Sequence, residues 1–176
     1  KTRLINARHP LLMLSFAAEN KTVVPLNVHL DEQLRVLLVS GPNAGGKSVA
    51  MKTVGLLQMM LQTGLLVPAE PHSEMGIFQQ IFADIGDDQS IESDLSTYSA
   101  HLNKMRHFVA FSNAKTLVLI DEFGTGTDPQ FGGPMAEAVL QVLNQKKARG
   151  VITTHYSNLK LFASDTEGLE NASMLF

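Results

Sequence analysis

The sequence predicts a single α/β domain over residues 1–176, with a mostly parallel sheet flanked by helices. Segments with strand patterning alternate with segments in which apolar residues recur at helical spacing, the order expected of parallel strands joined by helices. The central strand candidates are also nearly continuous apolar runs, as expected of strands covered on both faces. With 176 residues, 44% of them hydrophobic, the chain is large enough to bury one core.

The first predicted elements are two strands and a helix around a glycine-rich segment. Val23–Leu30 and Leu34–Ser40 are predicted as strands, and the polar stretch DEQ separates them. Helical spacing of apolar residues then runs over Ser48–Gln62 and ends at Gly64, a common helix terminator. The segment GPNAGGKS, Gly41–Ser48, therefore lies between a strand and a helix.

The second half of the chain continues the alternation. An acidic, turn-rich stretch, DIGDDQSIESD, interrupts it once, and Pro129 is expected to block early helix continuation. The final run ASMLF resembles a strand cut short, and Lys1 replaces an initiator Met, so we expect a domain of a longer protein. The predicted elements are the strand Ile77–Ala83, the helix Ser96–Phe111, the strand Thr116–Ile120, the helix Pro134–Lys147, the strand Val151–Thr154 and the helix Ser157–Ala163.

Composition excludes several classes of protein. The net charge of -3 does not favour nucleic-acid binding by this domain, and the basic residues Lys146, Lys147 and Arg149 are expected to form a solvated helix cap. The absence of cysteine excludes disulfides and thiolate metal sites. No apolar run reaches the roughly 18–20 residues of a membrane helix and no signal peptide is present, so we expect a cytoplasmic protein without membrane contact.

The glycine-rich segment fits the phosphate-binding pattern G-x-x-x-x-G-K-[ST]. Its glycines let successive backbone N–H groups point at phosphate oxygens, and the following helix adds its positive dipole end. Lys47 is expected to reach the β- and γ-phosphates, and Ser48 to coordinate Mg²⁺. The predicted nucleotide-binding residues are Gly41, Pro42, Asn43, Ala44, Gly45, Gly46, Lys47 and Ser48.

Two carboxylates, Asp121 and Glu122, follow the buried run LVLI. A carboxylate at a strand end beside the phosphate loop can hold Mg²⁺, usually through water, and this role is predicted for Asp121. Glu122 can then accept a proton from an attacking water, so its presence favours hydrolysis over nucleotide binding alone. The alternative is an exposed acidic strand terminus.

His155, in ITTHYS, ends the next predicted strand. An imidazole one strand away from the Mg²⁺ site can hydrogen-bond the γ-phosphate or the attacking water. A lone histidine is otherwise more often a surface or capping residue. Its position at a third strand end, after Thr153 and Thr154, favours the catalytic role.

Taken together, GPNAGGKS, LVLIDEFGTGTDP, DLSTYSAH and TTHYSNLK, in this order, resemble the ATPase domain of the MutS family, relatives of the ABC ATPases. ARHPLL and PLNVHL match the lead-in to the phosphate loop, so the resemblance covers Ala7 to Phe176. It implies a P-loop NTPase fold of ABC type that uses ATP and Mg²⁺. The absence of LSGGQ argues against a transporter ATPase.

Within the family, FADIGDDQSIESDLSTYSAH and MLQTGLLVPA are more similar to the bacterial MutS-two branch than to mismatch-repair MutS. Mismatch-repair members usually carry a glycine before the Ser-Thr pair and Phe-Met after it, whereas Asp94 and Leu95 precede it here and Tyr98 follows. A mismatch-repair ATPase domain remains the alternative.

The resemblance assigns Ser96 and Thr97 to a signature that faces the γ-phosphate bound by the opposite subunit of a homodimer. An ordinary helix N-cap is the alternative, since serine is a good N-cap residue. The resemblance also makes EFGTGTDP a loop through which the two sites communicate, although a plain turn would carry the same residues. Val24 lies where relatives contact adenine, or is simply part of the core.

For the longer protein, the MutS-two resemblance implies a cytoplasmic homodimer that suppresses homologous recombination by binding branched DNA. In some members it implies action on collided ribosomes. Clamp helices and a C-terminal Smr nuclease domain belong to full-length members and are not found in this sequence. A nucleotide-gated dimerisation module with incidental hydrolysis is the alternative from another functional class.

Overall fold

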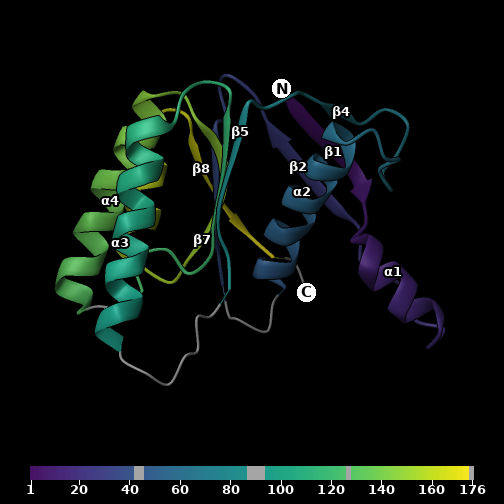
Figure 1. The fold of residues 1–176 in the computed structure, drawn as a ribbon, viewed down its shortest axis with the longest axis horizontal. Helices are drawn as coiled ribbons and strands as arrows, with labels where there is room; N and C mark the ends of the chain where they lie inside the picture. The colour runs from purple at the N-terminus through teal and green to yellow at the C-terminus, as the bar shows by residue number, and fades with distance from the viewer. Residues whose placement is uncertain (42–45, 87–93, 126–127, 175–176) are drawn as a thin grey trace.

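The computed structural model describes residues 1–41, 46–86, 94–125 and 128–174, and only the backbone of residues 94–98 and 129. Its strands form two sheets (Figure 1). Five parallel strands run in the order β5-β6-β7-β3-β8, and three antiparallel strands in the order β2-β1-β4. The strands are β1 (Thr2–Ala7), β2 (Leu26–Leu30), β3 (Val36–Ser40), β4 (Glu74–Met75), β5 (Gln80–Asp84), β6 (Thr116–Ile120), β7 (Arg149–Thr154) and β8 (Leu169–Ser173).

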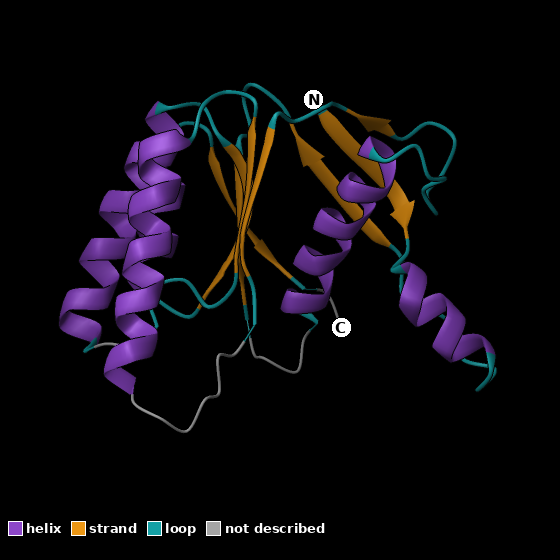
Figure 2. Cartoon of the chain, in the orientation of Figure 1, coloured by secondary structure: helices purple, strands orange, loops and turns teal. Residues whose placement is uncertain are grey.

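The helices arrange these sheets in layers. One helix, α2, lies between the two sheets, and α3 and α4 cover the other face of the parallel sheet (Figure 2). No helix in the described ranges is long and apolar enough to cross a bilayer. The helices are α1 (Pro10–Ala17), α2 (Lys47–Gln62), α3 (Asp94–Phe111), α4 (Pro129–Gln145) and α5 (Ser157–Asp165).

Each central strand sends alternate side chains into two hydrophobic clusters. In β6, Val118 and Ile120 pack towards α3, α4 and α5, whereas Leu117 and Leu119 pack towards α2. All four are buried. The parallel sheet is therefore covered on both faces, which confirms the α/β class with a parallel sheet flanked by helices.

The parallel register brings the predicted motifs to one edge of the sheet. Ser40, the last residue of β3, pairs with Thr154, the last residue of β7, and Ile120 at the end of β6 pairs with Ile152. The segments that follow these three strands therefore emerge at the same carboxyl edge, where open α/β sheets bind their ligands.

The predicted start of α4 was wrong. The helix begins at Pro129, not at Pro134, which lies inside it. Asp128 is the N-cap, and its carboxylate accepts a hydrogen bond from Gln130 N at 2.9 Å. Because a residue in the first helical turn needs no N–H partner, Pro129 starts this helix where we expected it to block one.

Three elements were not predicted, and several bounds differ. The sequence analysis missed β1, α1 and β4, which are all short and therefore carry weak patterning. In β1 the alternation of buried and exposed side chains is irregular, and Asn6 has a left-handed backbone conformation (φ 48°). β2 starts at Leu26 rather than Val23. β8 (LENAS) precedes most of the run ASMLF, since a strand at the sheet edge needs no continuous apolar sequence.

Two charged segments have structural partners. Asp31 accepts hydrogen bonds from the N–H groups of Gln33 (2.7 Å) and Leu34 (2.8 Å), and these bonds, chiefly that from Leu34, hold the pKa of its carboxyl below the usual range. In the predicted basic cap, Lys146 is the C-cap of α4, but Arg149 lies in β7 and donates to the carbonyl of Ala114 at 2.9 Å. The arginine is therefore not part of a solvated cap.

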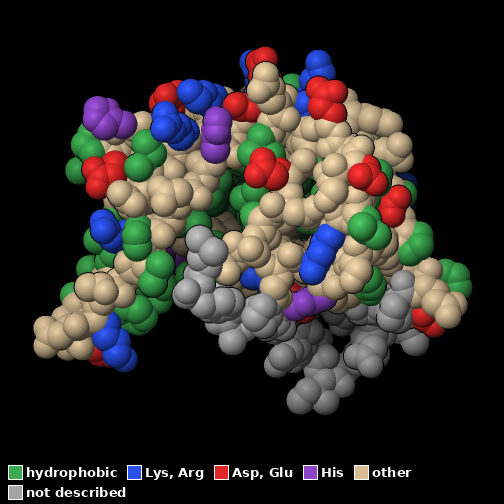
Figure 3. Space-filling view, turned by 180° about the vertical axis from the view of Figure 1, so that it is seen from behind, with side chains coloured by type: hydrophobic (Ala, Val, Ile, Leu, Met, Phe, Trp, Pro, Cys, Tyr) green, Lys and Arg blue, Asp and Glu red, His purple; other side chains and the backbone are tan. Residues whose placement is uncertain are grey.

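α1 differs from the other helices because it buries none of its residues. It projects from the body of the molecule (Figure 1), and hydrophobic side chains gather over it (Figure 3). Leu11, Met13 and Leu14 are exposed there. Its sequence PLLMLSFA is apolar all round, so helical patterning alone cannot assign it a buried face.

Candidate functional site

The phosphate loop joins β3 to α2. Gly46 is the N-cap of α2 in a left-handed conformation (φ 78°), and none of the side chains described there caps the helix. Lys47 is 2% exposed, and its Nζ donates to the carbonyl of Gly41. The uncapped N-terminus and the lysine both favour an anion at this point. Pro42, Asn43, Ala44 and Gly45 lie outside the described residues.

Ser48 and Asp121 meet although 73 positions separate them. Ser48 lies in the first turn of α2, Asp121 directly follows β6, and Oγ of the serine donates to Oδ1 of the aspartate at 3.0 Å. A third residue, the fully buried Thr153 of β7, donates to the same Oδ1 at 2.5 Å. Thr153 thus holds Asp121 from β7, the strand that lies between β6 and β3 in the sheet.

These oxygens fit a magnesium ion. Mg²⁺ binds oxygen at about 2.0–2.1 Å in an octahedron, so two ligands in adjacent positions lie about 2.9 Å apart. Ser48 Oγ and Asp121 Oδ1 are hydrogen-bonded at 3.0 Å, a separation that two neighbouring ligands of one Mg²⁺ can also keep. The described residues contain no group of three or more His, Asp or Glu side chains that could form an all-protein cage. Magnesium in nucleotide sites usually needs only one or two protein ligands.

Glu122 occupies a strained backbone position. Its φ is 49°, in the left-handed region that a non-glycine residue rarely adopts. Its N–H donates to Thr153 Oγ1 at 2.8 Å, and His155 Nε2 lies 3.7 Å from its Oε1. The last distance suits an ion pair but is too long for a hydrogen bond. Such strain persists where surrounding structure enforces it, and it often occurs at functional sites.

The turn after Glu122 is fastened to the end of β7. Phe123 N donates to the carbonyl of Thr153 at 2.8 Å, and Thr154 Oγ1 donates to the carbonyl of Phe123 at 3.1 Å. The hydroxyl of Tyr156 donates to Gly124 O at 3.0 Å. Gly124 has φ 91°, and a Cβ there would lie 2.8 Å from the Tyr156 ring, so only glycine fits. Several hydrogen bonds from Thr153 and Thr154 of β7 thus fix the segment that includes Glu122.

Comparison with known proteins identifies the family. A model of the family described as MutS domain V matches residues 37–176. The chain belongs to this family. Curated relatives named "Endonuclease MutS2" are similar over nearly the whole chain: 50% identical in Thermomicrobium roseum, over 100% of this chain and 22% of the relative; 47% in Caldicellulosiruptor bescii, over 98% and 21%; and 48% in Lactobacillus acidophilus, over 98% and 21%.

These relatives confirm the resemblance to the MutS family and, within it, to the MutS-two branch. The chain spans about a fifth of the length of the curated relatives it matches. The matched MutS domain V begins within β3, so it includes the phosphate loop, Asp121, Glu122 and His155. The domain is an ATPase-type domain.

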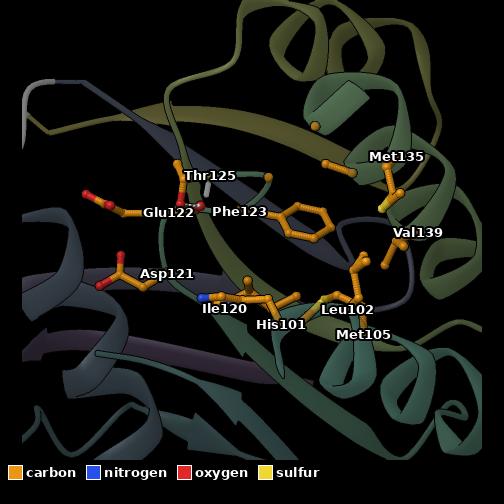
Figure 4. Close-up of a pocket in the computed structure, with 13 residues that line it drawn as sticks. His101, Leu102, Met105, Ile120, Asp121, Glu122, Phe123, Thr125, Met135 and Val139 are labelled. Carbon is orange, nitrogen blue, oxygen red and sulfur yellow. Dashed lines mark hydrogen bonds between the residues drawn. The ribbon is translucent and has the colours of Figure 1, made fainter. Parts of the chain in front are cut away.

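Behind the Glu122–Thr125 turn of this MutS domain V lies a mostly apolar pocket between α3 and α4. Phe123 points into it towards Met135 and Val139, whereas Asp121 and Glu122 point away from its apolar side chains (Figure 4). The ring of Phe123 is buried. Phe123 therefore anchors the turn on the apolar side, while Asp121 on the other side contacts Ser48 at the start of α2.

A second pocket lies beside the phosphate loop. It is lined by Gly46, Val49 and Ala50 from the loop and α2, and by Val24 from the segment before β2. Val24 is 83% exposed, so it is not part of the core. An apolar side chain exposed in a pocket next to a phosphate-binding loop suits the flat face of a base.

Ser96 and Thr97 belong to the N-terminal turn of α3, at the same edge of the sheet as the other motifs. Their side chains lie outside the described residues. Because α3 already begins at Asp94, these two residues are the third and fourth of the helix and neither is its N-cap, which removes that alternative. The role of a signature presented to a second subunit stays a prediction.

The sequence reasoning missed two residues at this edge of the sheet, one in the site and one beside it. Thr153 was considered only as a neighbour of His155, yet its hydroxyl joins Asp121 to Glu122. Asp84, in FADIGDD, was counted among turn residues, yet it ends β5 and its carboxylate is buried. A polar residue at the end of an otherwise apolar strand was the available signal for both.

Proposed function

We propose that this MutS domain V binds ATP with Mg²⁺ and hydrolyses ATP. The observation that carries the proposal is the meeting of Ser48 and Asp121, 3.0 Å apart, beside a glutamate held in a strained backbone conformation. A protein that binds a nucleotide without hydrolysing it would need the contact between Ser48 and Asp121 but not the glutamate beside it. Membership of an ATPase-type family supports the same activity.

Phosphate binding is assigned to the loop and the start of α2. The N–H groups after Gly46 and the helix dipole attract phosphate oxygens. Lys47 Nζ, which donates to the Gly41 carbonyl, would exchange this partner for β- and γ-phosphate oxygens. Ser48 and Asp121 would hold the magnesium ion, which supplies positive charge between the β- and γ-phosphates. The loop residues Pro42–Gly45 are proposed to complete the cradle.

Proton transfer is assigned to Glu122. Its carboxylate lies at the sheet edge, partly exposed, where it can accept a proton from the water that attacks the γ-phosphate. His155, 3.7 Å away, can donate to that water or to the γ-phosphate and keep the glutamate in place. Thr153 fixes the backbone from which Glu122 projects.

The nucleotide base is assigned to the pocket that Val24 lines with Gly46. An adenine placed there would cover part of the exposed valine side chain. Few polar groups surround this pocket, so we expect base contacts to be mainly apolar.

We further propose that two copies form a homodimer in which Ser96 and Thr97 of one copy complete the site of the other. The start of α3 offers free N–H groups and a positive dipole, both suited to a γ-phosphate. In the longer protein, nucleotide-driven changes in this dimer would act on DNA, in particular branched DNA and recombination intermediates, or on ribosomes, in the cytoplasm. Curated relatives carry the name endonuclease, and we assign any nuclease activity to segments outside this chain.

Replacement Glu122→Gln tests the hydrolytic proposal. We expect ATP turnover of the dimer to fall about 100-fold or more with ATP affinity retained, because an amide cannot accept the proton. The matched control is Glu170→Gln, an exposed residue of β8 whose loss should leave turnover unchanged. Equal turnover in Glu122→Gln and the wild type would remove Glu122 as the base. ATP-dependent dimerisation measured by sedimentation, with negligible turnover in the wild type, would favour a switch instead.

A further inference from the structure

A buried ionic cluster lies next to the proposed site and has no part in it so far. Asp84, the last residue of β5, has a side chain that is 1% exposed. Its Oδ2 lies 2.5 Å from His101 Nδ1 and its Oδ1 lies 2.8 Å from Lys104 Nζ. An ionised carboxylate only accepts hydrogen bonds, so both partners donate to it.

The cluster joins three elements at the carboxyl edge of the sheet. His101 and Lys104 are one turn apart on the same face of α3, and both side chains bond to the carboxylate at the end of β5. The backbone carbonyl of Asp84 also accepts the N–H of Asp121 at 2.9 Å, directly beside the proposed magnesium ligand. Asp84 is therefore bound to the metal-site strand through its backbone and to α3 through its side chain.

The rest of α3 is held in a different way. Phe108 stacks on Phe82 of β5, with ring centroids 5.0 Å apart, and Met105 is buried with it in the same hydrophobic cluster. These contacts lie in the C-terminal half of the helix, and apolar packing specifies direction weakly. The Asp84 cluster adds two directed bonds at the middle of the helix: Lys104 lies beside Met105, and His101 lies one turn closer to the N-terminal end. These bonds restrain rotation of the helix and its position along its axis.

We propose that Asp84 is a positioning residue: by holding His101 and Lys104, it sets where the N-terminal turn of α3 presents Ser96 and Thr97 to the partner subunit. This inference rests on the proposed composite site. A buried carboxylate requires its partners, so the sheet edge and α3 move as one unit. The cluster thus links the strand edge that holds Asp121 in one site to the signature offered to the other site.

Mixed dimers test the proposal, in the protein at its natural length. Co-expression with two affinity tags yields dimers of Asp84→Asn with Glu122→Gln subunits. Each homodimer is expected to lose about tenfold or more in kcat, with the KM for ATP within about twofold. In the mixed dimer, one site combines an intact Glu122 with an intact α3 from the other subunit, so turnover recovers above both parents.

The mixture of Ser96→Ala with Glu122→Gln subunits is the control for the composite site. If ATP turnover recovers in this control but not in the mixed dimer of Asp84→Asn with Glu122→Gln, Asp84 acts within the site of its own subunit. Our proposal is then overturned, while the proposed function stands. Failure of the control itself overturns the composite site, and the role of Asp84 with it. Wild-type kcat in the Asp84→Asn homodimer also overturns the proposal.

A second variant covers the case in which Asp84→Asn does not fold. Lys104 is 43% exposed in its side chain, so Lys104→Met should fold, which its thermal unfolding midpoint checks. We expect it to lower kcat and to recover in a mixed dimer with Glu122→Gln. Lys104→Arg retains the charge and should restore turnover. Wild-type kcat in Lys104→Met contradicts the proposal, as does equal loss in Lys104→Met and Lys104→Arg.

Discussion

At the scale of single residues, Thr153 explains why the acidic pair is well placed. One hydroxyl donates to Asp121 Oδ1 at 2.5 Å and accepts the N–H of Glu122 at 2.8 Å. Thr153 itself is fully buried and both bonds are part-buried, so a lost partner is replaced poorly by water. A single side chain therefore orients the proposed metal ligand and supports the backbone of the proposed base.

The replacement Thr153→Val separates these hydrogen bonds from packing. Valine has nearly the same shape but leaves Glu122 N and one acceptor of Asp121 without this partner, so we expect unfolding free energy to fall by about 1–3 kcal/mol. ATP turnover should fall as well, because the turn loses its support. Thr153→Ser keeps the hydroxyl and should retain most activity. Urea unfolding and steady-state turnover measure the two effects, and equal behaviour of the two variants would contradict this role.

Residues of this kind are difficult to predict from sequence. Gly46, Lys47, Ser48 and Asp121 stand in recognisable patterns, since phosphate and metal chemistry restrict both residue type and spacing. Thr153 stands in no such pattern, because a threonine in a strand is common and its partner is 32 positions away. Only the register of β6 and β7 brings the two together.

At the scale of elements, the start of α4 shows how a local signal was misinterpreted. A proline between a turn and a helix can end one element or begin the next, and the difference is decided by the preceding cap. Asp128 supplies that cap through its bond to Gln130 N. The Glu122–Thr125 turn is therefore followed closely by a helix that begins five residues earlier than predicted.

The replacement Asp128→Ala tests the cap. We expect unfolding free energy to fall by about 0.5–2 kcal/mol, because the helix loses an N-cap acceptor. Asp128→Asn keeps an acceptor oxygen and should cost less. Thermal denaturation followed by circular dichroism measures both. If Asp128→Ala is as stable as the wild type, the helix does not depend on this cap.

At the scale of the whole molecule, α2 connects two sheets of different kind. Its buried residues, among them Met51 and Leu57, share one hydrophobic cluster with Leu4 of the antiparallel sheet and Leu119 of the parallel sheet. The antiparallel strands are therefore part of the domain core and not an appendage. This arrangement places the segment with Val24 beside the phosphate loop.

The replacement Leu4→Ala tests whether the antiparallel sheet and the parallel sheet unfold together. Leu4 is 1% exposed, so its truncation should lower unfolding free energy by about 2–5 kcal/mol, and the domain should still unfold in one transition. Leu11→Ala is the matched control on α1, where the side chain is 63% exposed, and we expect a change within about 0.5 kcal/mol. Two separate transitions in urea would mean that the sheets fold independently.

The sequence by itself determined the class of the fold, the family, the central strands and the motifs that lie at their ends. Long apolar runs and restricted motifs carry this information locally, which explains why β6 was predicted to the residue. Tertiary structure decided the short and polar elements, the antiparallel sheet around α2, and the partners of Thr153 and Asp84. These depend on which strand ends lie side by side, and that is set by strand order, which no short stretch of sequence contains.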